Sequence, residues 1–216
     1  MNPQCVVGFV VAACALVATS TFAQGSVAGR IRSPTGTGVA GVTIQLDGDS
    51  VSVTPATGDF AIRVSRPGSH TLFFSHPRFR PVMSGIEYRV VVDTDTTPTA
   101  LTVNWPDLGE LVERACLGST SPQGVGVIGS VYPPPRGPQD TVDVVAGWEG
   151  TISLSGRRFG GIAARVKPDG SYLLCGLPPT RQVGLFVRRG LAIGATRALA
   201  TPPKGFVELI LQTPPL

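Results

Sequence analysis

The chain has 216 residues, of which 42% are hydrophobic and only 15% are charged, with a formal net charge of +4. This composition excludes a disordered charged tail and is sufficient for one large or two small domains with apolar cores. The 18 basic residues are scattered rather than gathered on one stretch, so no nucleic-acid partner is expected. Abundant glycine and proline without a long helical pattern favour an all-β fold of short strands joined by turns.

The N-terminal segment indicates export. Residues 5–18 form an uncharged apolar run, and Thr21 and Ala23 fit the small-residue rule for signal peptidase, so we expect residues 1–23 to be a cleaved signal peptide. The run is too short for a membrane span, and none is expected after cleavage. The alternative is a lipoprotein anchored at Cys14, which ends a segment resembling a lipoprotein cleavage box. The expected location is the periplasm or the exterior of a bacterial cell.

Signal removal would leave two cysteines in the mature chain, Cys116 and Cys175. Outside the cytoplasm an isolated pair of cysteines forms a disulfide by default. We therefore expect a bond between them. A reactive Cys175 is the alternative, and this bond would exclude it.

Two stretches of the chain share one pattern. Residues 56–74 and 167–187 each contain a glycine turn, an aromatic residue, a short apolar strand, a proline turn and a second strand. The aromatic residue is Phe60 in the first stretch and Tyr172 in the second. The glycine supplies the positive φ that a tight hairpin requires. The pattern predicts two copies of one β module.

A short helix is predicted between the two copies. Asp107 fits an N-cap position, and Glu110 follows three residues later as in a capping box. The expected organisation is a signal peptide at 1–23, a first β-sandwich at 24–105, a short helix and linker at 106–123, and a second, more divergent sandwich at 124–216.

These motifs resemble the carboxypeptidase regulatory-like domain, a transthyretin-like β-sandwich. The resemblance implies two tandem Greek-key sandwiches joined by a short helix. The second copy departs from the family pattern, because the strand at residues 142–148 lacks the proline and glycine that usually precede it. The matching segments are residues 27–31, 39–42, 57–60 and 67–72 in the first half, and 167–172 and 175–178 in the second.

Domains of this family usually act as non-catalytic modules beside enzymes or receptors, and they are grouped with carbohydrate-binding-like sandwiches. The resemblance therefore implies an exported binding or scaffolding module of the cell envelope, with an envelope protein or a glycan of unknown identity as its partner. The alternatives are a carbohydrate-binding module and an accessory partner of an envelope enzyme or outer-membrane receptor. Such motifs specify a fold much better than they specify a function.

No catalytic, cofactor or metal site is expected. The chain lacks the serine-hydrolase and zinc-protease motifs, and its two histidines, His70 and His76, have no evident third ligand. The residues best suited to stack on a sugar ring are Trp148, Trp105 and Tyr132. Packing inside the protein is the alternative role for the tryptophans, which are often buried or used as interface anchors.

Overall fold

The computed structural model describes residues 25–93, 97–118, 124–153 and 156–215. The predicted signal peptide, its cleavage site and the alternative anchor at Cys14 lie outside the described residues. Within these ranges the protein is all-β, as predicted, with a single α-helix. No helix in these ranges has the length and apolar character needed to cross a membrane.

The first sandwich consists of seven strands in two sheets. They are β1 (Gly25–Arg32), β2 (Thr43–Leu46), β3 (Asp49–Val53), β4 (Asp59–Val64), β5 (Gly68–Ser75), β6 (Ile86–Val92) and β7 (Thr99–Asn104), with the 3₁₀ helix η1 (Pro77–Phe79) between β5 and β6. One sheet has the order β4-β1-β7 and the other β3-β2-β5-β6. In the first sheet, β1 is antiparallel to β4 and parallel to β7.

The second sandwich repeats this arrangement. Its strands are β8 (Val125–Tyr132), β9 (Val142–Ser153), β10 (Gly156–Arg165), β11 (Ser171–Leu177), β12 (Gln182–Arg189), β13 (Ala192–Ile193), β14 (Arg197–Ala200) and β15 (Phe206–Gln212). One sheet has the order β11-β8-β15, and the other has β10-β9-β12-β13 with β14 paired to β12. Strand β8 is antiparallel to β11 and parallel to β15, as β1 is to β4 and β7.

Alternation along the strands builds a core between the two sheets of each sandwich. In the first, Val27 and Ile31 on β1 face Ile44 and Phe74 from the opposite sheet, and all four are fully buried. The second core is a separate cluster, with Tyr172 as its largest fully buried side chain.

One packing arrangement recurs in both cores. An aromatic residue on the outer antiparallel strand lies opposite a glycine on the central strand, which in turn lies opposite a leucine on the parallel strand. The hydroxyl of Tyr172 donates a hydrogen bond to the Leu209 carbonyl oxygen at 3.1 Å, a bond that a phenylalanine cannot make. The two trios are Phe60, Gly29 and Leu101 in the first sandwich and Tyr172, Gly129 and Leu209 in the second. They define equivalent positions in the two sandwiches.

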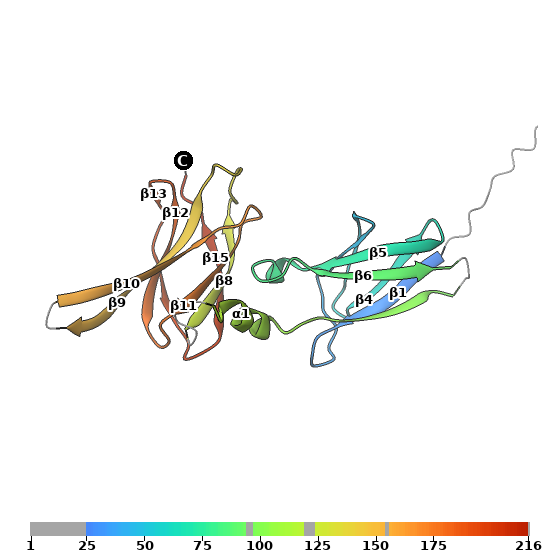
Figure 1. Ribbon diagram of the computed structural model, residues 1–216, viewed down its shortest axis with the longest axis horizontal. Coiled ribbons are helices and arrows are strands. Elements are labelled where there is room, and N and C mark those ends of the chain that lie inside the picture. The colour runs from blue at the N-terminus through green and yellow to red at the C-terminus, as the bar shows by residue number, and fades with distance from the viewer. Residues whose placement is uncertain (1–24, 94–96, 119–123, 154–155, 216) are drawn as a thin grey trace, which may run out of the picture.

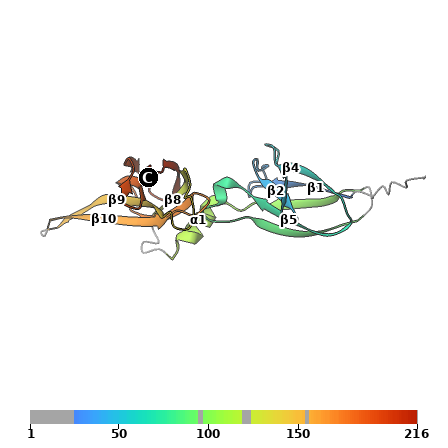
Figure 2. The same ribbon diagram turned by 90° about the horizontal axis from the view of Figure 1, so that it is seen from above.

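The two sandwiches lie end to end and make an elongated molecule, with the helix α1 (Leu108–Cys116) at their junction (Figure 1). The view from above shows the same extended outline, and in it the β9–β10 hairpin projects from the second sandwich (Figure 2). The junction is therefore where residues from both halves meet.

Candidate functional site

The junction begins with helix α1, which leaves the first sandwich and crosses to the second. The Asp107 side chain caps the helix by accepting a hydrogen bond from the Glu110 backbone N–H at 3.0 Å, which agrees with the predicted helix start. Leu108, Val112 and Cys116 are spaced four residues apart and form the buried face of the helix. The sequence therefore presents one apolar face of this helix to the second sandwich.

The last residue of the helix is covalently attached to the second sandwich. Cys116 and Cys175 form the expected disulfide, with an S–S distance of 2.03 Å and a Cα–Cα distance of 5.4 Å. Cys175 lies on β11 at the position equivalent to Arg63 on β4, so the shared fold does not require a cysteine there. The bond holds α1 against the outer face of the β11-β8-β15 sheet, the face turned away from the core of the second sandwich.

Apolar packing accompanies the disulfide. Ile128 of β8 belongs to the same buried cluster as the helix residues Leu108 and Val112, with Phe206 of β15 partly buried against it. A methyl group at Gly126 would lie 2.9 Å from the Val112 side chain, so the helix lies close against β8. The core of the first half thus continues across the junction.

A second connection runs through the η1 turn (residues 76–81). The Arg78 Nε donates to both carboxylate oxygens of Glu208, at 2.8 and 2.9 Å, across 130 positions of sequence. The Lys167 ammonium donates to the backbone carbonyls of Arg80 and Pro81 at 3.0 and 2.9 Å. The turn is thereby attached to two separate elements of the second sandwich.

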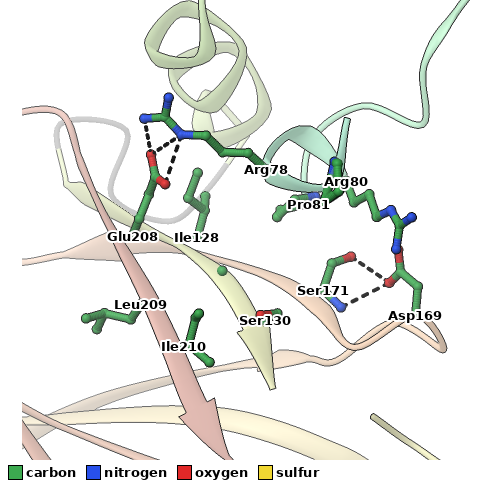
Figure 3. Close-up of a pocket in the computed structure, with 12 residues that line it drawn as sticks. Arg78, Arg80, Pro81, Ile128, Ser130, Asp169, Ser171, Glu208, Leu209 and Ile210 are labelled. Carbon is green, nitrogen blue, oxygen red and sulfur yellow. Dashed lines mark hydrogen bonds and ion pairs between the residues drawn. The ribbon is translucent and has the colours of Figure 1, made fainter. Parts of the chain in front are cut away.

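A groove of about 480 Å³ lies between the η1 turn and the second sandwich. Figure 3 shows Arg78 and Arg80 extending from the turn, with β15 carrying Glu208 and Ile210 on the far side of the groove. The lining residues are Pro77, Arg78, Arg80, Pro81, Ile128, Gly129, Ser130, Asp169, Ser171, Glu208, Leu209 and Ile210.

Asp169 supplies a carboxylate to this groove. Its Oδ1 accepts hydrogen bonds from the Ser171 backbone N–H at 3.0 Å and from the Ser171 hydroxyl at 2.7 Å. Burial by itself would raise the pKa of Asp169, but these hydrogen bonds and the charges of Arg80 and Lys167 hold the pKa below its usual value. The carboxylate is therefore ionised at neutral pH.

The three predicted stacking residues do not form one platform. The prediction is wrong for Trp105, which is 2% exposed and packs edge-to-face against Phe79 with ring centroids 5.5 Å apart. Its ring is enclosed where the chain passes from β7 to α1, and its indole N–H has no hydrogen-bond partner among the described residues. A sugar cannot reach a side chain buried in this way.

Trp148 and Tyr132 occupy different sheets of the second sandwich. Trp148 on β9 is half-buried, and its indole lies over Gly160 of β10, where an added methyl group would come within 2.4 Å of the ring. Tyr132 at the end of β8 is 68% exposed. Of the three candidates, Tyr132 is thus the most accessible.

The two histidines lie in different environments. The His70 Nδ1 is 2.8 Å from an Asp47 carboxylate oxygen, and its Nε2 is 2.9 Å from the Arg66 carbonyl oxygen. Both partners are acceptors, so the ring makes both hydrogen bonds only when both of its nitrogens carry a proton. The hydrogen bond to Asp47 raises the pKa of His70 despite partial burial, whereas burial lowers the pKa of His76.

This difference predicts the order in which the two histidines titrate. His70 should titrate above the ordinary value of 6.5 and His76 below it. Because its folded pKa is raised, His70 adds stability that is complete below 6.5 and is lost as the pH rises through its folded pKa. An NMR titration resolves both rings, since the chain has only two histidines. His70→Asn assigns the signals, and the reverse order would contradict the hydrogen bonds described.

Within the described ranges, no group of three or more His, Cys, Asp or Glu side chains is placed to hold a metal ion. The two halves are instead joined at the junction by the Arg78–Glu208 pair and by the hydrogen bonds of Lys167 to the η1 turn. The arrangement can hold two sandwiches together and offers an open groove between them.

The fold and its junction define the class of protein. It is a pair of β-sandwiches joined by a helix that is disulfide-bonded to the second sandwich. The family follows for the first half: residues 26–104 match the model of the carboxypeptidase regulatory-like domain, so the first sandwich is a domain of that family. The match ends before α1. A search of curated proteins gives no match.

Solved structures with some similarity include a streptococcal ancillary pilin, with 10% identity, a TM-score of 0.33 and coverage of 92% of this chain and 64% of the pilin. The shaft pilin SpaA of Lactobacillus rhamnosus GG has 7% identity and a TM-score of 0.33, with 89% and 99% covered. A DUF3823 family protein of Bacteroides ovatus has 11% identity and a TM-score of 0.28, with 82% and 98% covered. All three TM-scores are low, so these likenesses carry no conclusion about function.

Proposed function

We propose that this protein is a non-catalytic extracytoplasmic module that holds two β-sandwiches in one fixed arrangement and serves as a scaffold in the cell envelope. The observation that carries the proposal is the disulfide between the connecting helix and β11, which places a covalent bond across the junction. Structural disulfides persist in oxidising compartments, which supports a place outside the cytoplasm.

The noncovalent contacts support the same proposal. Two domains joined by a flexible linker move independently by default, and a fixed geometry needs an interface that resists bending. Here the helix packs on one part of the second sandwich, and the η1 turn reaches β15 through the Arg78–Glu208 pair. Because these attachments lie at different places on the second sandwich, they oppose both bending and rotation.

The fixed junction can be tested by small-angle X-ray scattering of the purified chain. The oxidised protein should scatter as one elongated body with the dimensions of the structure. Reduction combined with Arg78→Ala should shift the scattering toward that of a more flexible ensemble, because the covalent bond and the Arg78–Glu208 pair are then lost and only the helix packing and the Lys167 hydrogen bonds remain. The measurement gives the distribution of interatomic distances and shows whether a single conformer fits the scattering curve.

The matched control is Arg30→Ala under the same reducing conditions. Arg30 forms a comparable exposed ion pair with Asp59, with an Nη2–Oδ2 distance of 3.0 Å. Both residues belong to the first sandwich, so this pair does not cross the junction. Surface ion pairs contribute little to stability, so neither substitution should unfold a domain. The fixed junction would be refuted if the scattering of the oxidised wild-type protein could be fitted only by a flexible ensemble.

A further inference from the structure

Strand β15 is an edge strand of the second sandwich, with a hydrogen-bonded neighbour on one side only. At one end of the strand, the Gly126 N–H donates to the Gly205 carbonyl oxygen at 3.1 Å. At the other end, the Thr213 N–H donates to the Tyr132 carbonyl oxygen at 2.9 Å. In this parallel register the odd-numbered residues of β15 bond to β8, and the N–H and C=O groups of the even-numbered residues point away from it. Among the described residues, none forms a backbone hydrogen bond with these outward groups, which belong to Phe206, Glu208, Ile210 and Gln212.

The side chains of β15 suit pairing with another strand. Its sequence, FVELILQ, consists mainly of β-branched, aromatic and aliphatic residues. Ile210 is 71% exposed, and the core-facing Val207 and Leu209 are only partly buried. Glu208 is the only charged residue of the strand, and it is already paired with Arg78 of its own chain. A free edge of this kind is a site at which another strand can add.

The equivalent edge of the first sandwich, β7, is protected. A proline stands just before β7 at the position where β15 begins with a phenylalanine, and proline has no N–H to offer a further strand. A threonine takes the place of the exposed isoleucine. Proline and polar side chains are common protection for edge strands, so the shared fold does not require the open edge of β15. The aligned pairs are Pro98 with Phe206, Leu101 with Leu209 and Thr102 with Ile210.

The positions of the outward groups restrict how two copies of β15 can pair. Identical strands pair antiparallel about a twofold axis, and here even-numbered residues must lie opposite even-numbered ones. A register centred on Leu209 meets this condition along the whole strand. It places Glu208 opposite Ile210 of the second copy. It likewise places Phe206 opposite Gln212, so that all the outward groups are used in about eight backbone hydrogen bonds.

Other registers are less favourable. An axis at Glu208 would place two carboxylates directly opposite each other, and like charges in that position destabilise a strand pair. An axis at Ile210 would leave Phe206 without a partner. With the axis at Leu209 no charged residue faces another, and the two partly buried Leu209 side chains cover each other. The two 3-stranded sheets would then form one continuous sheet through both copies.

We propose that the free edge of β15 binds a second copy of this chain, with the two β15 strands antiparallel about Leu209. The self-complementary register favours a second copy over an extended segment of another protein, which is the rival occupant of such an edge. One strand pair is smaller than a standard protein interface, so the dimer should be reversible. This inference adds a partner to the proposed scaffold and does not depend on the fixed junction.

Sedimentation equilibrium of the purified oxidised chain tests the dimer over about a hundredfold range of concentration. The wild-type chain should show a reversible monomer–dimer equilibrium. Ile210→Pro should abolish the dimer, because the ring replaces an outward N–H that makes no bond to β8 and leaves the native pairing in place. The matched control is Thr102→Pro, the same change at the aligned position of β7, which should leave the dimer unchanged. Denaturant unfolding checks that both variants fold.

Cross-linking tests the register. Leu209 is the residue of β15 that would lie opposite itself, in a non-hydrogen-bonded pair with a Cα–Cα distance of about 4.5 Å. That distance is within the range of disulfides, so Leu209→Cys should give a covalent dimer under mild oxidation. Val207→Cys is the control, because this residue has the same orientation but would lie opposite Leu211 and should not form such a dimer.

Several results would overturn the proposal. They are a wild-type chain that stays monomeric, a dimer that survives Ile210→Pro, and a dimer that Thr102→Pro also abolishes. A covalent dimer of Val207→Cys in place of Leu209→Cys would overturn the register. A monomer that co-purifies with an extended peptide, lost in Ile210→Pro, would assign the edge to another protein. Scattering from the Ile210→Pro variant, which contains one copy of the chain, tests the fixed junction separately.

Discussion

Replacing either Cys116 or Cys175 with serine is expected to lower the free energy of unfolding by about 4 kcal/mol in the chain-entropy description, since the bond closes a loop between residues 59 positions apart. Each single variant should also lose the attachment of α1 to β11. The double variant should be no less stable than either single one, because the first substitution already removes the bond. Thermal and denaturant unfolding measure both effects.

The thiol content provides the check on this prediction. The folded oxidised chain should have no titratable thiol at these two positions, and reduction should expose both. Two reactive thiols at Cys116 and Cys175 before reduction would refute the bond. They would also return Cys175 to consideration as a reactive residue.

Gly129→Ala is expected to destabilise the second sandwich by about 3 kcal/mol or more. The glycine lies under Tyr172 at the centre of the β11-β8-β15 sheet, and an added methyl group would lie 1.7 Å from the Leu209 carbonyl oxygen. A backbone atom of a paired strand cannot move aside without loss of the pairing. Denaturant unfolding with a tyrosine or tryptophan probe measures the change.

The control for this substitution is Gly137→Ala. No atom lies within 4 Å of a methyl group built at Gly137, so the change there should be within a few tenths of a kcal/mol. Equal effects at the two positions would show that the destabilisation comes from loss of glycine in general. The predicted contrast comes from the close approach of β15 to β8.

The sequence allowed the local elements to be predicted because their determinants are local. The Asp107 cap depends on residues within one helical turn, and the turns at Gly58 and Gly170 need the positive φ that glycine adopts, which both have. The aromatic residues Phe60 and Tyr172 follow those turns and occupy equivalent core positions. The pairing of Cys116 with Cys175 could be predicted without structural information, because only these two cysteines remain after signal removal and the expected compartment is oxidising.

The roles of the aromatic candidates could not be decided in this way. Trp105 and Tyr132 both follow or end a strand, and their local sequences give no sign that one is buried and the other exposed. Burial of Trp105 depends on Phe79 and His76, which come from a different connection of the first sandwich. Exposure of Tyr132 depends on how far the first half covers the outer face of β8.

What the sequence by itself determined is the all-β class, the connecting helix and the cysteine pair. Each of these rests on a short-range pattern or on composition. Only the tertiary structure decided the junction. The Arg78–Glu208 pair joins residues 130 positions apart, and the groove takes its walls from both halves of the chain. Such contacts depend on the angle between two bodies, and a small rotation about α1 would separate them without changing any local signal in the sequence.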